Sequence, residues 1–145
     1  MIQSPSPSGE QRKIYLRALA SASSEPTALA TVALTTNGEL GGVEPLLVLR
    51  DQMRVAATRG AVWRWVAAHV EEIAARMAAQ QRQFLLELPS GLCTEADAAA
   101  LAELAPIAEK FVGGPRNLRA AAESIRLCAA RAEKQRAGAR AFFAR

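Results

Sequence analysis

Apolar residues recur along this chain at helical spacing. In the clearest case, over residues 60–77, four of them follow one another at steps of four, seven and four: Val62, Val66, Ile73 and Met77. Residues at such steps share one face of an α-helix, whereas a half-buried strand alternates at every second residue. The pattern predicts an amphipathic helix here, with His69 on the same face.

Prolines, glycines and capping residues divide the rest of the N-terminal half into further helices. We expect them at residues 10–22, 26–37 and 44–58, and a shorter helix at 80–88 closed by Pro89-Ser90-Gly91. Pro26 and Pro45 suit the first turn of a helix, where a missing N–H costs nothing. Asn37-Gly38 ends the second helix, and the residues after it are expected to continue as a loop.

The C-terminal part has the same punctuation. Thr94 with Asp97 resembles a capping box, in which the threonine side chain accepts from the first turn of a helix. Pro106 should interrupt that helix before Ile107. Gly113-Gly114-Pro115 then stops and restarts the chain. The last helix is expected over residues 116–143, with an apolar stripe at Leu118, Ala121, Ile125, Cys128, Ala132, Ala139 and Phe142.

Composition agrees with an all-α fold. Half of the 145 residues are hydrophobic, alanine is the commonest, and aromatic residues make up only 5%; alanine favours helices, whereas aromatic and β-branched residues favour strands. We expect a single helical domain over residues 10–145, preceded by a disordered lead at 1–9. Short turns favour stacked antiparallel hairpins, as in a HEAT-like solenoid, with a compact bundle as the alternative.

The single histidine raises the question of a zinc site. In the peptidase motif H-E-x-x-H, two histidines on one helix face hold the metal, but Val70 follows His69 and Ile73 stands where the second histidine belongs. Cys93 and Cys128 form no C-x-x-C pair and are predicted to be buried thiols, which leaves the compartment undetermined. No zinc, cofactor or catalytic triad is therefore expected in this chain.

Three further expectations concern membranes, the tryptophans and the role of His69. No apolar run reaches the roughly 20 residues that cross a bilayer, and the N-terminus lacks the apolar stretch of a signal peptide. Of Trp63 and Trp65, two residues apart, one should lie in the core and the other at least partly exposed. His69 should be a core or interface residue rather than a ligand.

Positive charge is concentrated in the last helix. Residues 116–145 carry a net charge of +6, against +4 for the whole chain. The basic residues are Arg116, Arg119, Arg126, Arg131, Lys134, Arg136, Arg140 and Arg145. They could form a solvated helix face, or a wall that attracts a peptide's carboxylate, with Arg119, Arg126 and Lys134 as candidates. Nucleic-acid binding is a third interpretation, disfavoured because no recognised motif accompanies the charge.

Three segments carry a family resemblance. They are RGAVWRWVAAHVEEI (59–73), preceded by NGEL; GLCTEADAAALAEL (91–104); and GGPRNLRAAAESIRLCAAR (113–131), followed by Phe142-Phe143. In this order they resemble the C-terminal helical domain of zinc aminopeptidases, the family of aminopeptidase N, puromycin-sensitive aminopeptidase and the endoplasmic-reticulum aminopeptidases. The resemblance covers roughly residues 11–144.

The resemblance implies an accessory role. In that family a separate domain holds zinc through H-E-x-x-H and a downstream glutamate, next to a G-x-M-E-N loop, and none of these motifs occurs here. Tyr15 does not correspond to the family's catalytic tyrosine, and His69 stands where the pattern often has asparagine. The implied domain covers the active-site chamber and limits peptide entry, so its partners would be the parent's catalytic domain and peptide substrates.

A stand-alone helical adaptor that binds a protein or peptide in a groove is the alternative function. The end of a helical stack should also leave apolar side chains uncovered. We therefore expect Ile14, Leu16 or Leu29 to be partly exposed or to take part in self-association.

Overall fold

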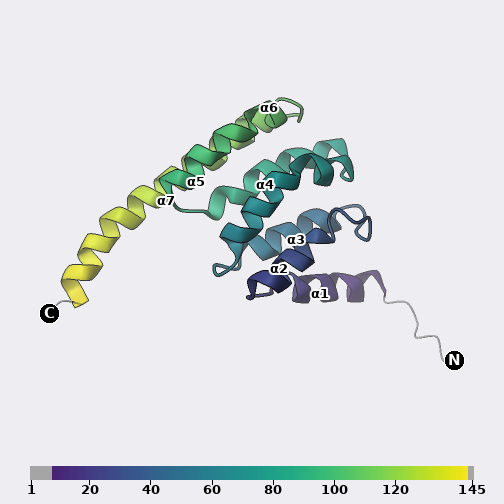
Figure 1. Cartoon of the computed structure of the whole chain (residues 1–145), viewed down its shortest axis with the longest axis horizontal. Coiled ribbons are helices and arrows are strands. Elements are labelled where there is room, and N and C mark those ends of the chain that lie inside the picture. The colour runs from purple at the N-terminus through teal and green to yellow at the C-terminus, as the bar shows by residue number, and fades with distance from the viewer. Residues whose placement is uncertain (1–7, 144–145) are drawn as a thin grey trace. The chain divides into compact units, whose positions relative to one another are not determined.

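The computed structural model describes residues 8–143, apart from the side chain of residue 137, and every regular element in that range is a helix (Figure 1). The predicted all-α fold is confirmed. The helices fall into two compact units, Met1–Met77 and Ala78–Arg145. One domain over residues 10–145 and a HEAT-like stack both stay predictions. The lead proposed for residues 1–9 lies largely outside the described range, and within it Ser8 caps the first helix.

The first unit contains α1 (Gly9–Leu19), α2 (Glu25–Ala33), α3 (Glu44–Met53) and α4 (Arg59–Ala75). Helices two apart in sequence pack together, α1 with α3 and α2 with α4, and α3 also contacts α2 and α4. Local signals set the starts: Ser8 forms a capping box with Gln11, Ser24 accepts from the backbone of Thr27, and α2 and α3 each carry a proline in the first turn.

The stripe predicted on α4 forms core. Val62, Val66, Ile73 and Met77 are all buried. Trp63 is buried and Trp65 is partly exposed, as expected for neighbours that point to different sides of a helix.

The third helix is shorter than predicted, ending at Met53 instead of Thr58. Gln52 accounts for the early end, because its buried side-chain amide donates to the Ala22 carbonyl at 2.8 Å and to Thr58 Oγ1 at 2.9 Å. These tertiary hydrogen bonds hold the residues after Met53 in turns, since a buried amide that lost its partners would cost free energy.

An ion pair joins the start of α3 to α1. Arg12 Nε lies 2.6 Å and Nη2 3.1 Å from the two carboxylate oxygens of Glu44, and Nη2 also donates to the Glu39 carbonyl at 2.7 Å. The Arg12 side chain, together with the Gly41 N–H at 3.0 Å, lowers the pKa of Glu44 below its usual value, because both stabilise the ionised carboxylate.

The exposed apolar residues predicted near the start of the chain are found in part. Ile14 is 61% exposed, Leu29 is half-buried, and Leu16 is 6% exposed because it packs with Ala20 and Val48 between α1 and α3. Tyr15 and Leu19 add to the uncovered side of α1. Self-association through this side stays a prediction.

The second unit begins with a run of 3-10 turns, η1 (Ala79–Gly91), which passes through Pro89. The segment ends at Gly91, the last residue of the predicted closing tripeptide, but it is a 3-10 helix that includes Pro89 and Ser90 instead of stopping at Leu88. A 3-10 helix places residues three apart on one side, and Leu86 and Pro89 are both buried in this way.

Four more elements complete the second unit: α5 (Glu95–Ala100), the 3-10 helix η2 (Leu101–Leu104), α6 (Ala105–Ala108) and α7 (Gly114–Phe143). Thr94 caps α5 by accepting from the Asp97 N–H at 3.1 Å, as predicted. The interruption expected at Pro106 is confirmed, because the chain passes through η2 and restarts as α6 with this proline in its first turn.

The stripe predicted on α7 is buried only in the first half of the helix. Leu118, Ala121 and Ile125 lie in the core, Cys128 and Ala132 are partly exposed, and Ala139 and Phe142 are exposed. With 30 residues, α7 is about 45 Å long. The elements that pack against it, η1, α5, η2 and α6, are much shorter, and the C-terminal part of α7 extends past α5 (Figure 1). The apolar stripe therefore extends beyond the part of α7 that is buried.

Candidate functional site

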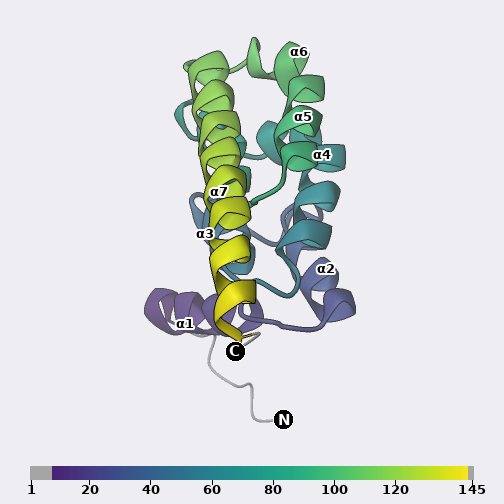
Figure 2. The same cartoon turned by 90° about the vertical axis from the view of Figure 1, so that its left-hand side faces the viewer.

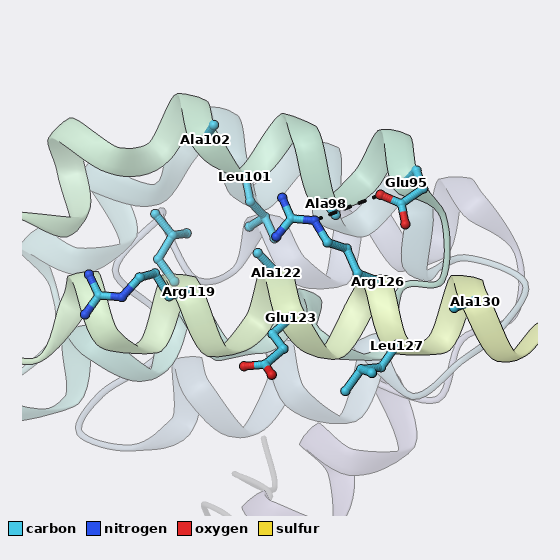
Figure 3. Close-up of a pocket in the computed structure, with 11 residues that line it drawn as sticks. Glu95, Ala98, Leu101, Ala102, Arg119, Ala122, Glu123, Arg126, Leu127 and Ala130 are labelled. Carbon is cyan, nitrogen blue, oxygen red and sulfur yellow. Dashed lines mark ion pairs between the residues drawn. The ribbon is translucent and has the colours of Figure 1, made fainter.

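A groove of about 720 Å³ lies along the seam between α5–η2 and α7, within the second unit (Figure 3). The two sides run antiparallel: Glu95 at the start of α5 lies opposite Arg126, and residues further along α5 and η2 meet residues earlier in α7. The lining residues are Glu95, Ala98, Leu101, Ala102, Leu118, Arg119, Ala122, Glu123, Arg126, Leu127 and Ala130.

The groove is mainly apolar because of its alanines. Four of the eleven lining residues are alanine, two from each side of the seam. A methyl group fills little volume. The helices can therefore approach each other at these alanines, and the surface above the seam remains hollow. Leu101 and Leu118 are buried beneath it, whereas Leu127 is 56% exposed. An exposed leucine beside an apolar hollow is the kind of surface that a ligand's apolar side chain can cover.

Charged side chains border this apolar surface. Arg126 reaches from α7 toward α5, where its Nε lies 3.9 Å from Glu95 Oε2 (Figure 3). Both side chains are largely exposed, and such a surface pair contributes little to stability. Within residues 8–143, Arg119 and Glu123 form no side-chain ion pair or hydrogen bond. The groove thus offers an unengaged guanidinium, an unengaged carboxylate and a loosely paired arginine.

A disulfide bond links the segment before α5 to α7, next to residues that line the groove. Cys93, just before α5, is bonded to Cys128 on α7, with the Cα atoms 5.0 Å apart. The prediction that both cysteines are buried thiols is wrong, and each is only half-buried. Sequence reasoning missed the pair because the residues are 35 apart. The antiparallel packing of α5 on α7, a tertiary feature, brings them together.

Two glycines form the turn that leads into α7. Gly113 has a φ of +76°, in the left-handed region that side chains rarely adopt. Gly114 begins α7 directly against the Ala108 carbonyl oxygen, and a Cβ at this position would overlap that atom. The chain can reverse this tightly because both positions lack a side chain.

The residues proposed from the sequence separate into two groups. Arg119 and Arg126 both line the groove. Lys134 does not: it lies eight residues beyond Arg126, about 12 Å further along the helix axis, on the exposed part of α7. Peptide binding by these residues stays a prediction.

His69 lies away from the groove-lining residues in sequence, in the first unit. Its ring stacks on Trp65 with centroids 4.2 Å apart, and Nδ1 lies 2.7 Å from the Trp65 carbonyl oxygen. Both contacts are one helical turn back on α4, so they orient the ring locally. Among the described residues, no group of three or more histidines, cysteines, aspartates or glutamates is placed to hold a metal ion.

Among the described helices we looked for a segment that could cross a membrane. No helix within the described part of the chain combines the length and apolar character of a transmembrane span.

No protein-family model, curated protein or solved structure matches the chain. The resemblance to the aminopeptidase C-terminal domain therefore depends on the three sequence segments alone.

Proposed function

We propose that this chain is a non-catalytic helical domain that binds a peptide segment in the α5–α7 groove. We propose further that it serves as the C-terminal domain of a zinc aminopeptidase and conditions peptide access to an active site on another domain. The observation that carries the first proposal is the groove itself, an apolar seam with an unengaged arginine beside it.

The chemistry of the groove suggests the type of peptide. Leu127 and the four alanines would cover an aliphatic or aromatic side chain, because burial of apolar surface is the main source of affinity. Arg119 could bind a carboxylate in bidentate fashion, a geometry that a guanidinium fork offers and a lysine does not. A peptide with an apolar residue next to its free C-terminal carboxylate would satisfy both groups.

The order of the three family-like segments supports the second proposal. All the segments that resemble the aminopeptidase domain lie within the described residues, and two of them, residues 91–104 and 113–131, supply the two sides of the groove. In a parent enzyme, zinc and the catalytic residues would come from the other domain, and this domain would supply binding.

A stand-alone peptide-binding adaptor is the second candidate, and the same groove supports it. The gene distinguishes the two. An aminopeptidase domain requires a reading frame that continues upstream into H-E-x-x-H, whereas a stop codon just before Met1 would leave the adaptor.

Fluorescence polarisation tests peptide binding. The probe is a fluorescein-labelled heptapeptide that ends in leucine with a free carboxylate, and its amidated counterpart serves as the ligand control. We expect Arg119→Ala to weaken binding of the free-acid peptide about tenfold, the value of one hydrogen bond to a charged group, and to change binding of the amide much less.

Arg140→Ala is the matched control variant, because it removes the same charge from the exposed end of the same helix, outside the groove. Equal losses for Arg119→Ala and Arg140→Ala would indicate general electrostatic attraction and contradict binding at the groove. In the whole enzyme, Arg119→Ala should raise KM for long peptides more than for dipeptides.

A further inference from the structure

The disulfide lies where it can control the groove. Cys93 is two residues before Glu95, and Cys128 lies between the groove residues Leu127 and Ala130. The covalent loop from Cys93 to Cys128 therefore includes α5, η2, α6, the glycine turn and the groove residues of α7 up to Leu127, and α5 and α7 lie side by side within it (Figure 2). The turn closes this hairpin at one end and the disulfide closes it at the other.

One side of the groove is built from very short helices. α5 has six residues, η2 has four and α6 has four, whereas α7 has 30. Isolated helices shorter than about 12–15 residues are marginal in water. The α5 side therefore holds its shape because it is attached to α7, and the long helix does not depend on it in the same way.

Few polar contacts hold α5 against α7 near the disulfide. The Arg126–Glu95 pair is long and exposed, and the hydrogen bond from Ser124 Oγ to the Ser90 carbonyl, at 3.2 Å, ends on η1 rather than on α5. Ala98 and Leu101 pack further along the seam. The start of α5 is therefore the part of the groove that depends most on the covalent bond.

The two sulfur atoms lie beside surface hollows. Cys128 lines one hollow together with Ser124 and Leu127, and Cys93 lines another together with Thr94 and Glu95. A small dithiol can approach through either hollow, because exchange requires a thiolate to reach one sulfur.

We propose that the Cys93–Cys128 disulfide is a redox switch for ligand binding in the α5–α7 groove: the oxidised form holds α5 against α7 and binds, and the reduced form loses affinity. This inference rests on the proposed function. Reduction takes two electrons and two protons from an external dithiol, which becomes a disulfide as the protein gains two thiols. A thiolate of the reductant attacks one sulfur to form a mixed disulfide, and its second thiolate releases the second cysteine.

The inference connects binding to the compartment. Disulfides persist in oxidising environments and are rare where glutathione and thioredoxin keep thiols reduced. The groove would therefore bind well in an oxidising compartment and poorly in a reducing one.

The test measures binding of the labelled heptapeptide to the air-oxidised protein and to the same protein reduced with dithiothreitol, with the protein's free thiols counted by alkylation and mass spectrometry. We expect at least tenfold weaker binding after reduction. The double variant Cys93→Ser/Cys128→Ser should bind like the reduced protein and should not respond to reductant. Cys93→Ser alone should behave in the same way.

Amide hydrogen exchange is measured on the same samples, to separate a local opening from loss of the fold. We expect faster exchange in residues 95–104 after reduction, with the first unit unchanged. Equal affinity of the two redox forms would overturn the redox inference and leave the proposed function intact. Binding by neither form would overturn the proposed function and the redox inference together.

Discussion

Two aliphatic side chains on α7, only two residues apart, provide a sharp test of which side of the helix packs and which side binds. Ile125 is 0% exposed and does not line the groove, whereas Leu127 is 56% exposed at the groove surface. Replacing a buried isoleucine by alanine costs about 2–5 kcal/mol of unfolding free energy, because the removed methyl groups lose their contacts and leave a cavity. An exposed leucine costs less than about 0.5 kcal/mol.

For Ile125→Ala we take a loss of about 3 kcal/mol. In a chain of 145 residues, each kcal/mol lowers the melting temperature by roughly 2–4 °C, so a decrease of roughly 6–12 °C is expected. Leu127→Ala should leave the melting temperature within a few degrees of the parent chain. It should instead weaken binding of the labelled heptapeptide about tenfold, which corresponds to the roughly 1.5 kcal/mol of apolar burial lost from the contact.

Far-UV circular dichroism is the appropriate assay for stability. It follows the loss of helix throughout the chain, whereas both tryptophans, Trp63 and Trp65, belong to the first unit. Leu127→Ala serves as the matched control for Ile125→Ala. Equal destabilisation by the two substitutions, or unchanged peptide binding by Leu127→Ala, would refute this assignment of the two sides of α7.

Three further predictions concern stability. Reducing the disulfide should lower the unfolding free energy by about 4 kcal/mol, the chain-entropy value for a 35-residue separation, measured by urea denaturation with and without reductant; no change would contradict it. Gly114→Ala should lower the unfolding free energy by about 1–3 kcal/mol, because the new Cβ would overlap the Ala108 carbonyl oxygen. Gly138→Ala, in an open position on the same helix, should raise the unfolding free energy by about 0.5–1 kcal/mol. Destabilisation by both substitutions would contradict this contrast. Because Arg12 lowers the pKa of Glu44, the stability from this pair is fully present above the ordinary carboxyl pKa and is lost as the pH falls through the lowered pKa. Glu44→Gln should therefore flatten the acid side of a plot of the urea unfolding midpoint against pH. An unchanged plot would contradict this prediction.

Sequence patterns predicted correctly those features that depend on residues close together in the chain. The stripe on α4, the cap at Thr94 and the prolines in first turns each determine a few residues within one or two turns of helix. These features depend on spacing and backbone hydrogen bonding, both of which can be read directly from a sequence.

The features that sequence reasoning missed depend on tertiary packing. The disulfide requires α5 and α7 to lie antiparallel in one register, and the early end of α3 depends on Gln52 reaching Ala22 and Thr58. The stripe on α7 continues past the elements that could cover it, so periodicity alone could not show where burial stops.

The candidate site was predicted in part for the same reason. Arg119 and Arg126 were proposed from the charge on the last helix, and both line the groove. The opposite side, Glu95 to Ala102, carried a helix-start and a family-like pattern but no binding signal, because alanines on a short helix resemble ordinary helical sequence. Lys134 shared the charge pattern but lies beyond the elements that form the groove.

The most direct test of peptide binding at the groove is a two-dimensional ¹H–¹⁵N NMR titration of the oxidised protein with the unlabelled heptapeptide. We expect saturable shifts in the backbone amides of residues 95–102 and 118–130, the two sides of the groove, and none in α1–α4 beyond the noise. Absence of shifts at millimolar peptide, or shifts centred on the first unit, would contradict the proposal that the α5–α7 groove is the binding site.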